Sequence, residues 1–140
     1  MKFVLVCLLV LGSLSSFAKI PATEAFSNLL TSGSFEGKNE AGKCVVKVDI
    51  KVDSVVVSVE TKNDYQAFAL LDNGSNYSVE ETTGAIYSSQ KLNFPRYDQG
   101  GTKHLSVRPT ADSIQFAVSQ VLFDHRGNDA STYSTCTLAK

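Results

Sequence analysis

Apolar side chains occupy nearly every second position of one long segment, KCVVKVDIKVDSVVVSVETK (residues 43–62). A period of two is typical of a strand with one buried face, because successive side chains point to opposite sides. The apolar face of the first strand comprises Cys44, Val46, Val48, Ile50 and Val52, and that of the second comprises Val55, Val57 and Val59. A turn at Asp53 and Ser54 separates the two, so the segment predicts a β-hairpin.

Turn-forming residues recur at short intervals through the rest of the chain, and residues 113–120 alternate again. Counting a first strand at residues 33–38, we expect eight or nine strands joined largely by hairpins. A sheet with one solvated face must protect its two edges. We therefore expect an all-β fold, a single small antiparallel β-barrel of about eight strands connected as a meander; a β-sandwich is the alternative.

The period changes near the start, in KIPATEAFSNLLT (residues 19–31), where Phe26, Leu29 and Leu30 lie three and four residues apart. This spacing predicts a short N-terminal amphipathic helix. A helix of this length is not stable alone in water. We expect it to pack Phe26 and Leu29 against one end of the β structure.

The first segment, residues 1–18, has the pattern of a secretory signal peptide: Lys2, an apolar run, and small residues ending at Ala18. The apolar run is about half of the roughly 20 residues that a membrane-spanning helix needs. We therefore expect residues 19–140 to form one exported domain, secreted or periplasmic, that does not span a membrane.

The cysteines support export and barrel closure. Cys7 leaves with the signal peptide, so Cys44 and Cys136 remain. In an oxidising compartment an even count predicts one disulfide, which would hold the first long strand and the last segment within about 6 Å. The alternative is a metal or redox site, for which there is no Cys-x-x-Cys and only His104 and His125 to assist.

Charge and motifs limit the functional classes. The chain has 13 Lys and Arg and 14 Asp and Glu, and because only Lys2 leaves with the signal peptide, the remaining domain has a net charge near minus two. There is no basic cluster, so we expect no nucleic-acid partner. There is also no Gly-x-Ser-x-Gly elbow for a nucleophile. We expect no enzyme, no catalytic residue and no cofactor.

One loop contains possible oxygen ligands for calcium, in DHRGND (residues 124–129). Its spacing does not match a twelve-residue calcium loop, and turn chemistry explains the same residues. We therefore expect no metal.

The longest break in the alternation is NFPRYDQGGTKH (residues 93–104). Aromatic and arginine side chains anchor many recognition surfaces, and loops on a rigid sheet often bind partners. The candidate contact loop therefore comprises Phe94, Arg96, Tyr97 and His104. The alternative is that its aromatic residues only cover a barrel mouth.

The segment Gly33-Ser34-Phe35-Glu36-Gly37, after a short helix, resembles the Gly-x-Trp opening of the lipocalin and wider calycin barrels. The resemblance covers five residues and has Phe35 in place of the tryptophan, and the chain contains no Trp. It implies a barrel that binds a small apolar ligand inside. We assign no family on this segment.

Two functions follow as hypotheses. The first is an exported binding protein whose barrel holds a small apolar molecule, with Ala67, Ala69, Ala117 and Ser119 as small interior candidates. The second is an inhibitor or interaction module that acts on a secreted or envelope enzyme through its loops. An interior cavity would favour the first, and a filled interior the second.

The pairing of the two cysteines makes a testable prediction. The exported protein should carry no free thiol, because Cys44 and Cys136 bond to each other. Alkylation without reductant should therefore add no mass, and alkylation after reduction should modify both cysteines. Two modified cysteines before reduction would remove the covalent argument for barrel closure.

Overall fold

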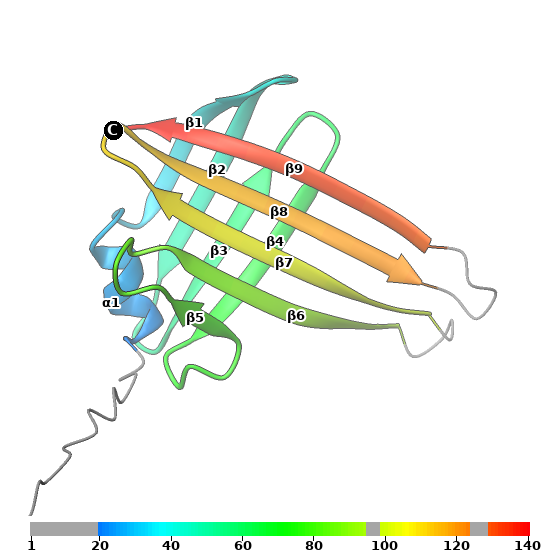
Figure 1. Ribbon diagram of the computed structural model, residues 1–140, viewed down its shortest axis with the longest axis horizontal. Helices are drawn as coiled ribbons and strands as arrows, with labels where there is room; N and C mark the ends of the chain where they lie inside the picture. Colours follow the sequence, from blue (N-terminus) through cyan, green and yellow to red (C-terminus); the bar gives the residue numbers. More distant parts are fainter. Residues whose placement is uncertain (1–19, 95–98, 124–128) are drawn as a thin grey trace, which may run out of the picture.

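The computed structural model describes residues 20–94, 99–123 and 129–140 (Figure 1). The segment expected to be the signal peptide, Arg96 and Tyr97, and the loop at 124–128 lie outside this part of the chain. Helix α1 (Ala22–Ser27) is followed by strands β1 (Gly33–Asn39), β2 (Gly42–Ile50), β3 (Ser54–Glu60), β4 (Tyr65–Leu71), β5 (Tyr77–Val79), β6 (Ile86–Phe94), β7 (Gln99–Pro109), β8 (Ser113–Phe123) and β9 (Asp129–Ala139).

The strands form one antiparallel sheet in the order β4-β3-β2-β1-β9-β8-β7-β6-β5. Each strand lies beside its neighbour in the chain, and β9 returns to pair with β1. The result is a nearly closed barrel whose open seam lies between β4 and β5, as Figure 1 shows from one side. The prediction of a single small barrel is confirmed, and the sandwich alternative is not observed.

The position of the seam follows from strand number. A ring in which all neighbours are antiparallel needs an even number of strands. Every paired neighbour is antiparallel, β9 with β1 included, so β4 and β5 point in the same direction. The three-residue β5 therefore does not complete the ladder with β4, and the seam must be closed in another way.

The opposite side of the barrel is closed covalently. Cys44 of β2 and Cys136 of β9 form a disulfide with a Cα–Cα distance of 5.8 Å, as the sequence predicts. Strand β1 lies between these two strands, and its Gly37 is the register partner of Cys44. A Cβ added at Gly37 would lie 2.7 Å from Cys136 Sγ and 2.7 Å from the Thr137 carbonyl oxygen. Glycine at this position leaves the room that the bridge needs to cross β1.

Alternating side chains fill the interior. Strand β3 contributes Val55, Val57 and Val59, all at most 1% exposed, and β8 contributes Ile114, Phe116 and Val118. Phe68 and Leu70 of β4 complete the same cluster. Burial of a side chain of this size contributes about 1.5 to 3 kcal/mol relative to an exposed one. The barrel is therefore held mainly by a dry apolar interior.

Helix α1 covers one end of the barrel, beside β2 and β3 (Figure 1). It buries Ala22, Ala25 and Phe26, and Phe26 is fully buried in the core cluster. Asp72, after β4, accepts hydrogen bonds from the Thr23 backbone N–H and hydroxyl at 3.0 and 2.9 Å. The predicted short helix is confirmed, although it ends at Ser27 and leaves Leu29 half-buried beyond it.

Polar side chains close the seam. The Asn76 side-chain amide donates to the Ala69 carbonyl at 2.6 Å and accepts from the Leu71 N–H at 3.2 Å, as a paired peptide group would. Gln90 of β6 also donates to the Ala69 carbonyl, at 2.9 Å. Lys103 of β7 donates to the Ala67 carbonyl. Edge groups of β4 therefore gain partners although no strand pairs with that edge.

The end of the barrel opposite α1 has a polar layer. Gln66 of β4 is 7% exposed, and its amide donates to Gln120 of β8 at 2.6 Å. The same amide donates to Asp64 at 3.2 Å, and the Ser134 hydroxyl donates to Asp64 at 3.4 Å. These hydrogen bonds satisfy polar groups at the rim of the apolar core.

Two sequence interpretations are wrong in detail. Val52 is 98% exposed, because β2 ends at Ile50 and the chain turns with a hydrogen bond from the Lys51 N–H to the Ser54 carbonyl. The small residues expected to leave space in the interior have side chains that point outward, because a residue next to each of them in the strand is buried. They are Ala67, Ala69, Ala117 and Ser119, and none belongs to the core cluster.

The crossing at Gly37 yields a stability prediction. Gly37→Ala should lower the free energy of unfolding by about 1 to 3 kcal/mol, because the new methyl group must displace the disulfide or the β9 backbone. Gly33→Ala is the matched control on the same strand, since its Cβ would meet only the Phe35 ring, at 3.6 Å. Denaturant unfolding of both variants checks this, and equal losses would contradict the crowding at Gly37.

The seam yields a second stability prediction. Asn76→Ala should cost about 1 kcal/mol, as expected for lost side-chain hydrogen bonds, and should speed hydrogen exchange of the Leu71 amide. Asn63→Ala is the control, since Asn63 is exposed and has no hydrogen bond within the described part of the chain. Unchanged exchange at Leu71 in the Asn76 variant would show that the side-chain amide does not close the seam.

Candidate functional site

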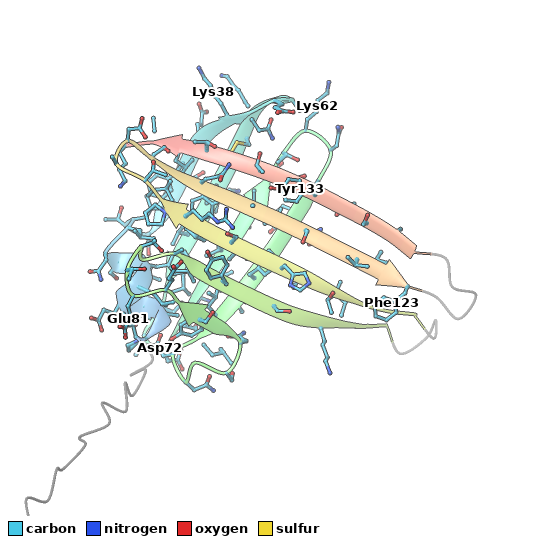
Figure 2. All side chains as sticks on the ribbon, in the orientation of Figure 1. Lys38, Lys62, Asp72, Glu81, Phe123 and Tyr133 are labelled. Atoms are coloured by element: carbon cyan, nitrogen blue, oxygen red, sulfur yellow. A yellow bond between two sulfur atoms is a disulfide. The ribbon has the colours of Figure 1, made fainter. Side chains whose placement is uncertain are left out.

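Strands β6 to β9 form the front of the barrel (Figure 1). Strands β7, β8 and β9 each have 11 residues, whereas β3 and β4 each have 7. The far ends of the long strands therefore continue past the Gln66–Gln120 hydrogen bond that marks the rim. Figure 2 shows Phe123 near the end of β8 and Tyr133 on β9; they are 47% and 71% exposed.

The predicted contact loop is mostly strand. Residues 93–104 run from the end of β6 into β7, and Gln99 is already the register partner of Phe94. His104 lies well inside β7 and is exposed on the outer face, opposite Ser89. Arg96 and Tyr97 fall outside the described residues, so their role as contacts stays a prediction. The structure thus places His104 on the surface of the sheet, within a strand.

An open groove of about 570 Å³ lies on the outer face of this sheet. Its borders include Tyr87 of β6, Arg108 of β7 and Tyr133 of β9, and its floor includes Ser106 and Ala117. Alternation places these side chains outside, because Leu105, Val107, Phe116 and Val118 point into the core. The sequence hypothesis of a loop site did not include Tyr87, Ser106, Arg108 or Tyr133.

Register explains the shape of the groove. Across neighbouring strands, Tyr87 pairs with Ser106, Ser106 with Ala117, and Ala117 with Thr135. In the next outer row, His104 pairs with Ser119, which pairs with Tyr133. The small side chains of Ser106, Ala117 and Ser119 thus lie between the two tyrosines and form a low floor, with His104 and Arg108 of β7 standing on either side of Ser106.

Three polar groups of β7 in this groove have no polar partner among the described residues. Arg108 forms no ion pair there, and its guanidinium lies 6.0 Å from the centroid of the Tyr87 ring, within cation–π range. His104 forms no hydrogen bond or ion pair there. The Ser106 hydroxyl oxygen is buried and unpartnered. Buried polar groups normally have partners, so the Ser106 hydroxyl is an exception that needs a reason.

A second depression, of about 660 Å³, lies on the other side of Tyr133. Its walls include Glu40 after β1 and Asp64 before β4, together with Thr132 and Thr135 of β9. Tyr133 borders both depressions and therefore forms the ridge between them. The two sides of the ridge differ in charge, with acidic groups on this side and Arg108 on the other.

Among the described residues two titratable side chains are perturbed, and both belong to the scaffold. Burial lowers the pKa of Lys103, whose ammonium lies 5.0 Å from the centroid of the Phe68 ring. Burial, and then the negative charge of Asp72, raise the pKa of Tyr77, whose hydroxyl donates to the Ile20 carbonyl at 2.6 Å. Neither forms a nucleophile–base pair, and their interactions hold the seam and the N-terminal segment.

Residues 20–94, 99–123 and 129–140 contain no group of three or more His, Cys, Asp or Glu side chains placed to hold a metal ion. Within the same ranges, no helix has the length and apolar character needed to cross a membrane. Comparison of the chain with protein-family models, with curated proteins and with solved structures finds no match. Arguments about function must therefore start from the surface itself.

Proposed function

We propose that the protein is an exported, non-enzymatic binding protein that recognises a partner protein with the outer face of β6 to β9. The carrying observation is the groove between Tyr87 and Tyr133, with Arg108 at its border and small hydroxylated residues on its floor. Tyrosine and arginine are enriched among residues that dominate binding energy at protein interfaces. Serine supplies adaptable hydrogen bonding beside rigid tyrosines, as in antibody paratopes.

The large side chains buried in the interior support a surface site over an internal one. Phe26, Phe68 and Phe116 are each at most 1% exposed and occupy the core together with the valines of β2 and β3. The small residues expected to leave interior space point outward instead. A small apolar molecule inside the barrel remains the second candidate from the sequence, and the experiment below tests it directly.

The disulfide supports export, because such bonds persist in oxidising compartments. It also supports a rigid binding surface, since β9, which carries Tyr133, is tied to the far side of the barrel. Rigid presentation lowers the entropic cost of binding. The partner is then a secreted or envelope protein, and inhibition of an envelope enzyme is one form that such binding takes.

The test is affinity capture from envelope and culture-medium extracts of the source organism, using the disulfide-intact protein. Wild type and Tyr65→Ser should capture the same partner, and Tyr87→Ser/Tyr133→Ser should lose affinity about tenfold or more, as expected for interface anchors. Tyr65 is the matched control because it is a tyrosine of β4, 61% exposed and away from the groove.

Two results would contradict the proposal. Capture that is equal in all variants would show that the groove is not the binding surface. The second result is recovery of a small apolar molecule in organic extracts of wild type and of every variant, while no captured protein depends on Tyr87 and Tyr133. That result would favour a ligand inside the barrel.

A further inference from the structure

Three of the groove's polar groups without a partner in the described part of the chain share one strand and one face. His104, Ser106 and Arg108 are alternate residues of β7, and all three line the groove. Alternate side chains of a strand point the same way and lie roughly 6.6 Å apart, so the row extends over roughly 13 Å. No other strand presents three polar groups without partners within the described part of the groove.

The groove lacks negative charge. Among the described residues that line it there is no Asp or Glu, and its basic side chains are Arg108 and His104. Arg108 has a planar fork of N–H donors that matches a carboxylate, and the Tyr87 ring beneath it leaves that fork available. The groove thus offers hydrogen-bond donors that have no acceptor among the described residues. A negatively charged acceptor best complements the row formed by His104, Ser106 and Arg108.

We infer that the partner presents an extended acidic segment that lies along β7, with carboxylate side chains at alternate positions facing the row His104, Ser106 and Arg108. An extended peptide repeats its side chains at the same spacing as β7, so successive acceptors meet successive donors. Tyr87 and Tyr133 border the segment on its two sides. This inference rests on the proposed function and names the chemistry of the partner.

The position of Ser106 supports an occupant. Its hydroxyl lies at the centre of the row, buried and without a partner. A polar group left so is costly, and because the oxygen itself is not exposed, a ligand acceptor removes that cost only where a local side-chain shift uncovers it on binding. The floor around it is formed by Ala117 and Ser119 of β8, which are small enough for an extended segment to approach β7.

The probe for the test is a blocked peptide of alternating Thr and Glu, compared with peptides in which Gln or Lys replaces Glu. We expect the Glu peptide to shift the backbone amide resonances of residues 104–108 and 115–119, and to bind about tenfold or more tightly than the Gln peptide. Its affinity should fall as salt rises, because exposed charges are screened. The Lys peptide should not bind.

Variants locate the effect. Arg108→Gln should reduce the affinity for the Glu peptide about tenfold, to that of the Gln peptide, whereas Lys62→Gln should leave it unchanged. Lys62 is the control because it is exposed, lies away from the groove and removes the same charge. Ser106→Ala should weaken binding several-fold without lowering the melting temperature, since it removes a buried hydroxyl that has no partner, and the thermal melts of the Arg108 and Lys62 variants should match wild type.

Several results would overturn the inference. These are equal binding of the Glu and Gln peptides, equal losses in the Arg108 and Lys62 variants, no effect of Ser106→Ala, or occupation of the groove by a sulfated oligosaccharide but not by the Glu peptide. A natural partner that depends on Tyr87 and Tyr133 but not on Arg108 would also overturn it. That last result would leave the proposed function intact, so the two failures are distinguishable.

Discussion

The pairing of β9 with β1, fixed by the Cys44–Cys136 disulfide, is the constraint on which the rest of the structure depends. It converts a nine-stranded meander into a nearly closed barrel by joining the two ends of the chain. The bridge spans 92 residues of sequence. In the chain-entropy model a loop of that size corresponds to about 4 to 5 kcal/mol, as an upper figure. Gly37 permits this closure because the bridge crosses β1 where any side chain would collide with it.

Because β1 pairs with β9, the unpaired edges of the sheet are those of β4 and β5. An odd strand number forces two neighbours to run in the same direction, and the edge of β4 is then met by side chains in place of a strand. Asn76 imitates a peptide group there, and Lys103 reaches a β4 carbonyl at the cost of partial burial of its charge. Backbone N–H and C=O groups need hydrogen-bond partners, and side chains can provide them where no strand pairs with an edge.

The same architecture provides the candidate binding surface. The first strands are short and serve mainly to enclose the core, whereas β6 to β9 extend past the rim and present a broad outer face (Figure 1). On that face, register brings two tyrosines to the borders of a floor of small residues, and three polar groups of β7 have no partner among the described residues. The proposals for a protein partner and for an acidic segment both follow from this arrangement, and neither uses the barrel interior.

The sequence by itself determined the fold class, the short helix, the disulfide and most of the core, because a period of two and a pair of cysteines are local signals with direct physical meaning. Val55, Val57 and Val59 could be assigned to the interior from alternation alone. Only the tertiary structure decided which face Ala117 and Ser119 occupy, that residues 99–104 belong to a strand, and that Tyr87, Ser106 and Tyr133 share one surface. The reason is that side chains on different strands become neighbours through register, and register is set by pairing across the sheet.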